Sequence, residues 1–183
     1  MGGVGSVLIL LIVLPGIGFL FGVVGFLLVL LAVRKIADRV GDEAIFGNMR
    51  YAVVVVVVAI VATVALIIFL LPQLFTLDPT RPPNAADVFA PEAIASLFSI
   101  LVVAWVLLLL SAFFLRRSFE AIADGLDLPM FATVGLLYLI GAATFVIFVG
   151  FVVLFVAGIL QVVAFLSLRE GSENPRPGSE AVK

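Results

Sequence analysis

The sequence predicts an all-α protein, a polytopic bundle of six transmembrane helices. Of its 183 residues, 64% are hydrophobic and only 12% are charged. Soluble domains carry about 25% charged residues, and a soluble fold of this size has too little interior to bury so much apolar surface. The charge-free stretches cover residues 1–33, 51–77, 93–115 and 128–168. A spanning helix needs about 20 apolar residues, so each stretch is long enough for at least one.

The first stretch, residues 1–33, predicts two helices separated by Pro15–Gly16 and Gly18, because these residues interrupt helices. The first arm, 2–14, is a short spanning helix, a re-entrant arm or half of one kinked helix. In the last case the protein has five helices and an external N terminus. The segment has no basic region and no cleavage site of a signal peptide, so we expect it to be retained.

Three glycines follow this break at nearly GxxxG spacing: Gly18, Gly22 and Gly25. Small residues at such spacing let two helices approach closely in lipid. We therefore predict close helix packing here, within the chain or between chains, in preference to the lining of a pore.

The second and third stretches predict one spanning helix each. The earlier helix begins near Tyr51 and ends at Pro72. Its valine run at 53–58 would indicate a strand in water, but a lone strand cannot cross lipid with its backbone unpaired. The later helix has Pro91 in its first turn and ends at Arg116–Arg117, where positive charge favours a helix C terminus.

The last stretch, 128–168, predicts a helical hairpin. As one helix, its 41 residues would reach about 60 Å at about 1.5 Å per residue, twice the hydrocarbon thickness of about 30 Å. Gly150 lies near its middle and is the expected turn residue. The predicted helices are 131–148 and 151–168.

A turn at Gly150 brings Tyr138 and Gln161 to a similar depth, because they lie twelve and eleven residues from it. A polar group in lipid seeks a partner. We predict that the two side chains meet across the hairpin or share a neighbouring helix's polar group. Gly141 and Gly158 are expected to let the two arms approach closely.

The basic residues predict the orientation. Six helices place both termini and the connectors 34–50 and 116–127 on one side of the membrane. That side collects nine of the ten basic residues and leaves only Arg81 on the other. The positive-inside rule then places both termini in the cytoplasm, which predicts a multi-pass protein of the cell membrane.

The external segment between Pro72 and Ala93 is rich in proline, which prevents a long helix. We expect 78–86 to stay exposed. Three large apolar side chains of this segment are expected to dock onto the bundle: Phe75, Val88 and Phe89. Residues 1–168 are predicted to form one transmembrane domain, and the polar residues 169–183 to form a disordered cytoplasmic tail.

The two cytoplasmic connectors resemble each other. Each has basic residues at a helix exit and an IAD triplet, at 36–38 and 122–124. Further counterparts are Asp42 with Asp127, and Ile45–Phe46 with Met130–Phe131. Both connectors lie on one side, so a duplication would be parallel rather than inverted. Chance similarity within a low-complexity sequence is the alternative.

Three segments carry a resemblance to a known family: "RKIADRVGDEAIF", "RRSFEAIADGLDLPMF" and "GLLYLIGAATFVIFVGFVVLFVAGILQVVAFLSL". They resemble the archaeal domain-of-unknown-function family numbered nine hundred and ninety-six. The resemblance covers most of 1–168 and implies a multi-pass archaeal membrane protein. It implies no activity, cofactor or catalytic residue.

No catalytic, cofactor or metal site is expected. The chain has no Cys and no His, and catalysis or ion coupling within a membrane usually needs ionisable groups at depth. The carboxylates of interest all fall in the cytoplasmic connectors: Asp38, Asp42, Glu43, Glu120, Asp124 and Asp127. Arg34 with Asp38, and Arg116 with Glu120, have the spacing of surface ion pairs on one helix. The alternative is a cation site in which Asp38 and Asp124 would be the best ligands.

These observations favour a non-enzymatic structural, accessory or lipid-interacting membrane component. A passive channel or small-solute transporter is the alternative. The expected partners are the lipid bilayer and either a second copy or another membrane protein. Basic residues at the cytoplasmic side could hold anionic lipid headgroups. Nucleic acid is not expected, because the net charge is −2 and no basic stripe is present.

Overall fold

The computed structural model describes residues 2–11, 17–74 and 91–173. These residues form helices with no strand among them: α1 (Gly2–Leu10), α2 (Gly18–Val40), α3 (Glu43–Leu74), α5 (Pro91–Leu126), α6 (Pro129–Thr144), the 3-10 helix η2 (Phe145–Ile147) and α7 (Val149–Glu173). Five of the helices are long and apolar enough to cross a membrane. The predicted six-helix α-bundle is confirmed.

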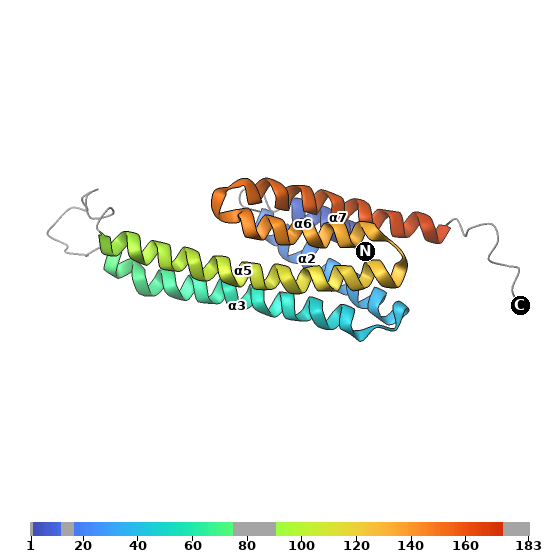
Figure 1. The fold of residues 1–183 in the computed structure, drawn as a ribbon, viewed down its shortest axis with the longest axis horizontal. Coiled ribbons are helices and arrows are strands. Elements are labelled where there is room, and N and C mark those ends of the chain that lie inside the picture. The colour runs from blue at the N-terminus through green and yellow to red at the C-terminus, as the bar shows by residue number, and fades with distance from the viewer. Residues whose placement is uncertain (1, 12–16, 75–90, 174–183) are drawn as a thin grey trace, which may run out of the picture.

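Three pairs of helices build the bundle (Figure 1). The long helices α3 and α5 pack along each other, and α6 packs on α5 and returns through a tight turn as α7. The short helix α1 lies against both α2 and α7. The connectors α2–α3 and α5–α6 lie at one end, and α3 and α5 project beyond the α6–α7 turn at the other (Figure 1).

The predicted helix ends at the two connectors are wrong. Helix α3 begins at Glu43, and α5 continues past Arg116–Arg117 to Leu126. The connectors stay helical because one side of each is apolar and packs into the bundle, which stabilises a helix more than intrinsic propensity does. Ile45 and Ile122, one from each connector, are fully buried.

The tightly packed core lies at this connector end. Its largest buried apolar side chains come from five helices: Val29, Val33, Ile45, Met49, Phe119, Ile122, Phe131, Val134 and Phe165. Towards the other end, α3 and α5 expose most of their apolar side chains, as expected where lipid is the solvent.

The two connectors share one backbone geometry. Each helix ends on a residue with positive φ, Gly41 (75°) and Asp127 (53°). The next N–H in each connector donates to a carbonyl five residues back, from Asp42 to Ala37 (3.3 Å) and from Leu128 to Ala123 (3.0 Å). A bond of this kind, which spans five residues, is one of the two that define the Schellman motif at the end of a helix.

Equivalent residues of the two connectors are therefore 86 positions apart, as Gly41 and Asp127 are. The predicted matches of Asp42 with Asp127 and of Ile45–Phe46 with Met130–Phe131 are therefore each wrong by one residue. Asp tolerates the left-handed region better than most residues other than Gly, so the second connector keeps the geometry without a glycine. Helices often end in this way, so the shared geometry fits both the parallel duplication and chance similarity.

The sequence predicted Gly150 as the turn residue of the α6–α7 hairpin, and this prediction is wrong. The turn is η2 followed by Phe148, whose φ is 61°. Gly150 lies in the first turn of α7, where a Cβ would overlap the carbonyl of Gly141 and the backbone of Phe145. A glycine is needed here because the two arms touch, whereas the left-handed position is held by a phenylalanine.

The other predicted small contacts are confirmed in part. A Cβ on Gly141 would meet Leu154 of α7, so this glycine does let the arms approach. Gly158 instead faces Leu10 of α1. Gly25 packs against the backbone of α1 at Gly5, which confirms close packing within the chain at one of the three predicted glycines.

Helix α1 has nine residues and is therefore about 14 Å long at about 1.5 Å per residue. This is half the hydrocarbon thickness of about 30 Å, so α1 as described is too short to cross alone. The predicted break at Pro15–Gly16 and the docking of Phe75, Val88 and Phe89 lie outside the described residues. Helix α7 continues past Leu168 to Glu173, and residues after 173 also lie outside the described part.

Candidate functional site

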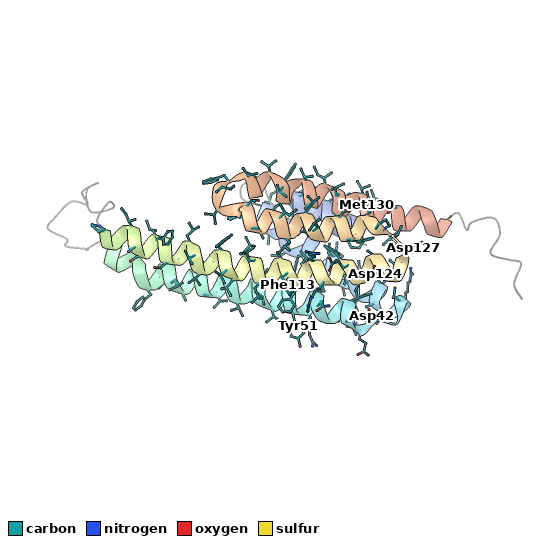
Figure 2. The ribbon with its side chains drawn as sticks, in the orientation of Figure 1. Asp42, Tyr51, Phe113, Asp124, Asp127 and Met130 are labelled. Atoms are coloured by element: carbon teal, nitrogen blue, oxygen red, sulfur yellow. The ribbon has the colours of Figure 1, made fainter. Side chains whose placement is uncertain are left out.

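The connector end of the bundle carries most of the charged side chains among the described residues. Figure 2 shows Asp42, Asp124 and Asp127 at this end, on the two connectors. Asp124 and Asp127 are exposed, and Asp42 accepts the N–H of Ala44 at 2.8 Å. The Asp42 carboxylate therefore caps the start of α3.

One of the two predicted ion pairs is present. Arg116 and Glu120 approach to 2.7 Å, with 36% and 39% of their side chains exposed. Such a surface pair contributes under about 1 kcal/mol. The guanidinium of Arg34 lies 5.7 Å from the ring centre of Phe46, and no bond from it to Asp38 occurs within the described ranges.

The alternative cation site gains no support from the geometry. Asp38 lines a hollow of about 550 Å³ together with Glu43, Arg34 and Arg50, so its charges are mixed. Asp124 does not line that hollow. Among the residues described, no three ligating side chains come together as a metal site would require.

Basic side chains of α2 border a second hollow at this end. It measures about 360 Å³ and lies beside the start of α1, with Lys35 and Arg39 on one side. Phe165 and Leu166 of α7 supply an apolar wall. Cationic groups above an apolar wall fit the predicted contact with anionic headgroups.

An apolar cavity lies deeper, between α1, α3, α5, α6 and α7. We call it the apolar cleft, and its volume is about 480 Å³. It lies along the α6–α7 hairpin, with Ile9 and Leu10 at the end of α1. Its remaining lining is Val56, Leu108, Ser111, Ala112, Leu115, Tyr138, Ala142, Phe145, Phe151, Leu154, Phe155 and Gly158. None of these side chains is charged.

The two polar side chains of the cleft wall both bond to the protein. Ser111 donates to the carbonyl of Ala52 at 3.1 Å, which ties α5 to α3. The Tyr138 hydroxyl donates to Oε1 of Gln161 at 2.6 Å, which confirms the predicted contact across the hairpin. No buried side-chain nitrogen or oxygen in the described part lacks a partner, so the wall presents hydrocarbon.

The ring of Tyr138 is held by aromatic neighbours at the base of the cleft. It stacks on Phe119 of α5 with ring centres 6.3 Å apart. Phe119 in turn lies 6.1 Å from Phe131, and Phe131 meets Phe165 edge to face at 5.3 Å. These rings connect the cleft to the core at the connector end and fix the direction of the hydroxyl.

A shallower hollow of about 370 Å³ continues from the cleft along α3 and α5. The two hollows share Val56, Leu108 and Phe145. Trp105 lines the second one and donates its ring N–H to the carbonyl of Ala142 at 3.0 Å. A single Trp gave no functional signal in the sequence. Its role depends on α6 ending beside it, which the sequence does not reveal.

The comparisons with known proteins agree with this architecture. The sequence model of a family described as protein of unknown function (DUF996) matches residues 21–159. The chain is 29% identical over 176 residues to a protein of Methanocaldococcus jannaschii named Uncharacterized protein MJ1644, covering 95% of this chain and 94% of that one. No solved structure matches. The family match extends from α2 into α7 and includes most of the cleft, so the chain belongs to the DUF996 family.

Proposed function

We propose that the protein is a non-enzymatic membrane component that holds the hydrocarbon chain of a lipid in the apolar cleft. The observation that carries this proposal is the chemistry of the cleft wall. Its volume of about 480 Å³ falls within the range of roughly 300–1,000 Å³ that is usual for ligand sites. Its polar side chains, Ser111 and Tyr138, already have partners in the protein.

This chemistry favours a lipid chain over an ion or a polar solute. A polar ligand that leaves water needs hydrogen bonds in return, and the cleft wall has no charged side chain to supply them. An alkyl chain needs only an apolar surface. The lack of Asp, Glu, Lys and Arg in the wall likewise supports a role without catalysis.

The distribution of charge supports a cell-membrane location with both termini in the cytoplasm. Four basic side chains are exposed near the connector end: Lys35, Arg39, Arg50 and Arg117. Helix α1 begins and helix α7 ends at the same end of the bundle (Figure 1). Cytoplasmic segments are those enriched in basic residues. An Arg39→Cys variant should therefore react with an impermeant maleimide in inverted vesicles and not in intact cells. Reaction in intact cells would reverse the orientation.

Photocrosslinking tests the lipid site. The purified protein is placed in vesicles that contain a phospholipid with a diazirine at the end of one acyl chain, and the crosslinked peptides are identified by mass spectrometry. We expect adducts on residues of the cleft, including Phe151 and Phe155. Adducts spread evenly over the outer faces of α3 and α5 would count against the proposal.

A matched pair of variants sharpens this test. Gly158→Leu adds a side chain beside the flexible end of Leu10 and fills part of the cleft. Val152→Leu enlarges an exposed side chain that does not line it. Cleft adducts should fall in the first variant and persist in the second. Equal adducts in both would disprove a specific site.

The passive channel or small-solute transporter remains the second candidate, and the same vesicles test it. Entry of small ions, glycerol or water is compared between vesicles with protein and vesicles without it. We expect equal rates. Faster entry with the protein would favour the channel and would require a wet path that the cleft wall does not offer.

A further inference from the structure

We propose that the α6–α7 hairpin is re-entrant: it enters the membrane from the connector side and turns back near the middle of the hydrocarbon. In this arrangement α3 and α5 cross the whole membrane, while acyl chains of the far leaflet cover the tip of the hairpin, residues 145–149. The inference concerns depth in the bilayer and does not depend on the lipid site proposed above.

The first observation is the level of the turn along α5. The bond from Trp105 to the carbonyl of Ala142 fixes the end of α6 beside Trp105. Trp105 stands in the middle of the charge-free stretch 93–115. From there α5 continues to Pro91, a further 20 Å or so at about 1.5 Å per residue. Figure 1 shows α3 and α5 projecting well past the hairpin.

The charged residues of α3 and α5 mark the membrane surface on the connector side. Arg116 and Arg117 follow Trp105 by eleven and twelve residues, which corresponds to roughly 17 Å of helix. Arg50 lies near the same level, because Tyr51 beside it contacts Phe114 with ring centres 5.6 Å apart. Half of the hydrocarbon layer is about 15 Å thick, so the level of Trp105 and of the turn is close to mid-membrane.

The second observation is the composition of the tip. No charged or hydrogen-bonding side chain occurs from Phe145 through Leu160. Phe148 is 86% exposed and Ile147 is 65% exposed. A turn at a membrane surface meets water and headgroups, where such side chains are unfavourable. Within the hydrocarbon the same exposure carries no penalty.

The third observation is the hydrogen bonding of the turn, since backbone polar groups inside a bilayer must find partners in the protein. The N–H of Phe148 donates to Phe145 (3.1 Å), and that of Phe151 donates to Phe148 (3.2 Å). The carbonyl of Ala142, near the end of α6, receives Trp105. The hydroxyl of Thr144 donates to the carbonyl of Ile140 at 2.8 Å. These bonds engage several of the polar groups at the reversal, which suits the turn to an apolar medium.

The hollow beside Trp105 agrees with this arrangement. It is about 370 Å³ in volume and lies between α3, α5 and Phe145 at the tip. Beyond the tip, Figure 1 shows the described parts of α3 and α5 side by side, with no other helix next to them. Acyl chains of the far leaflet are therefore the partner that fits the surface between the tip and the far end of this pair.

Depth-dependent quenching tests the proposal, and the absence of native Cys makes single labels clean. Phe148→Cys carries a bimane fluorophore in vesicles whose lipids bear a nitroxide either at the headgroup or at the acyl terminus. Phe148 is almost fully exposed, so the change should leave packing intact, and an unchanged elution volume checks this. Tyr51→Cys, also exposed, serves as the label at the membrane surface.

We expect the label at position 148 to be quenched more by the acyl-terminal nitroxide, and the label at position 51 more by the headgroup nitroxide. Stronger headgroup quenching at position 148 would mean that the hairpin crosses the membrane and would overturn the proposal.

Chemical access supplies a second measurement. The Phe148→Cys side chain should escape an impermeant maleimide from both faces of the membrane and react after the protein is dissolved in detergent. Reaction from the far face of intact membranes would also overturn the proposal. Asp42→Cys, at the connector end (Figure 2), is the positive control and should react in inverted vesicles.

Discussion

The hydroxyl of Tyr138 on α6 and Oε1 of Gln161 on α7 lie 2.6 Å apart, although the two residues are 23 positions apart in the chain. Gln161 is 4% exposed, so its side chain depends on the protein for partners. The bond joins the arms of the hairpin at the wall of the apolar cleft. It sets the register of the two helices, because a shift of either arm would leave both groups unpaired.

The first prediction follows from this bond. Tyr138→Phe and Gln161→Leu should each lower the free energy of unfolding, and the double variant should lose less than the sum. Interhelical hydrogen bonds in membranes couple by about 0.6 kcal/mol on average and reach about 1.7 kcal/mol, which bounds the expected coupling. Unfolding in detergent micelles measures it. Ser111→Ala combined with Gln161→Leu is the control and should be additive, because Ser111 bonds to Ala52 instead.

The second prediction concerns Gly150. Gly150→Ala places a Cβ onto the backbone of α6 and should destabilise the protein by about 1–3 kcal/mol, as overpacking does. Gly47→Ala is the control, because a Cβ at Gly47 meets nothing within 4 Å, and Ala there should be neutral or favour the helix. Equal thermal stability of both variants would show that the hairpin arms are not in close contact.

The third prediction compares the two connectors. Gly41→Ala should lower stability by about 1 kcal/mol, because an L side chain in the left-handed region is strained. Asp127→Gly should raise stability by up to about 1 kcal/mol, because it relieves the same strain at the equivalent position. Both effects are read from unfolding curves. Changes of the same sign would argue against a shared geometry.

The fourth prediction contrasts two serines of α5. Ser118 is fully buried and donates to the carbonyl of Ile45 on α3 at 2.8 Å. Ser99 is exposed and bonds to Ala95 in its own helix. Ser118→Ala should cost about 1 kcal/mol of unfolding free energy, the usual net value of such a bond, whereas Ser99→Ala should change little. A larger loss at Ser99 would be inconsistent with the packing of α3 on α5.

The sequence predicted the helices and the Tyr138–Gln161 contact because both depend on simple quantities. The length of an apolar run against bilayer thickness gives the hairpin, and equal distance from its middle gives the contact. The contact was predicted correctly although the turn is at Phe148 and not at Gly150, because both residues lie near the middle of the apolar run.

The failures arise where tertiary packing decides the outcome. Charged residues in the connectors indicated the ends of helices, yet Phe119 and Ile122 pack into the core on the opposite side and keep α5 helical as far as Leu126. Gly150 has the residue type of a turn, but it is needed for contact with α6. The apolar cleft could not be predicted, because five helices build its walls. No local sequence pattern indicates how these helices are placed relative to one another.

The position of α1 has a consequence for biosynthesis. Helix α1 is synthesised well before α7, yet the two pack together, with Gly2 on Phe165 and Leu10 on Gly158. Domains generally fold as units as the chain is made, but α1, which can pack on α2 early, meets its second partner only when translation reaches α7. Truncation before Gly158 should therefore leave the α7-facing side of α1 uncovered, in a chain that quality-control proteases would recognise and remove.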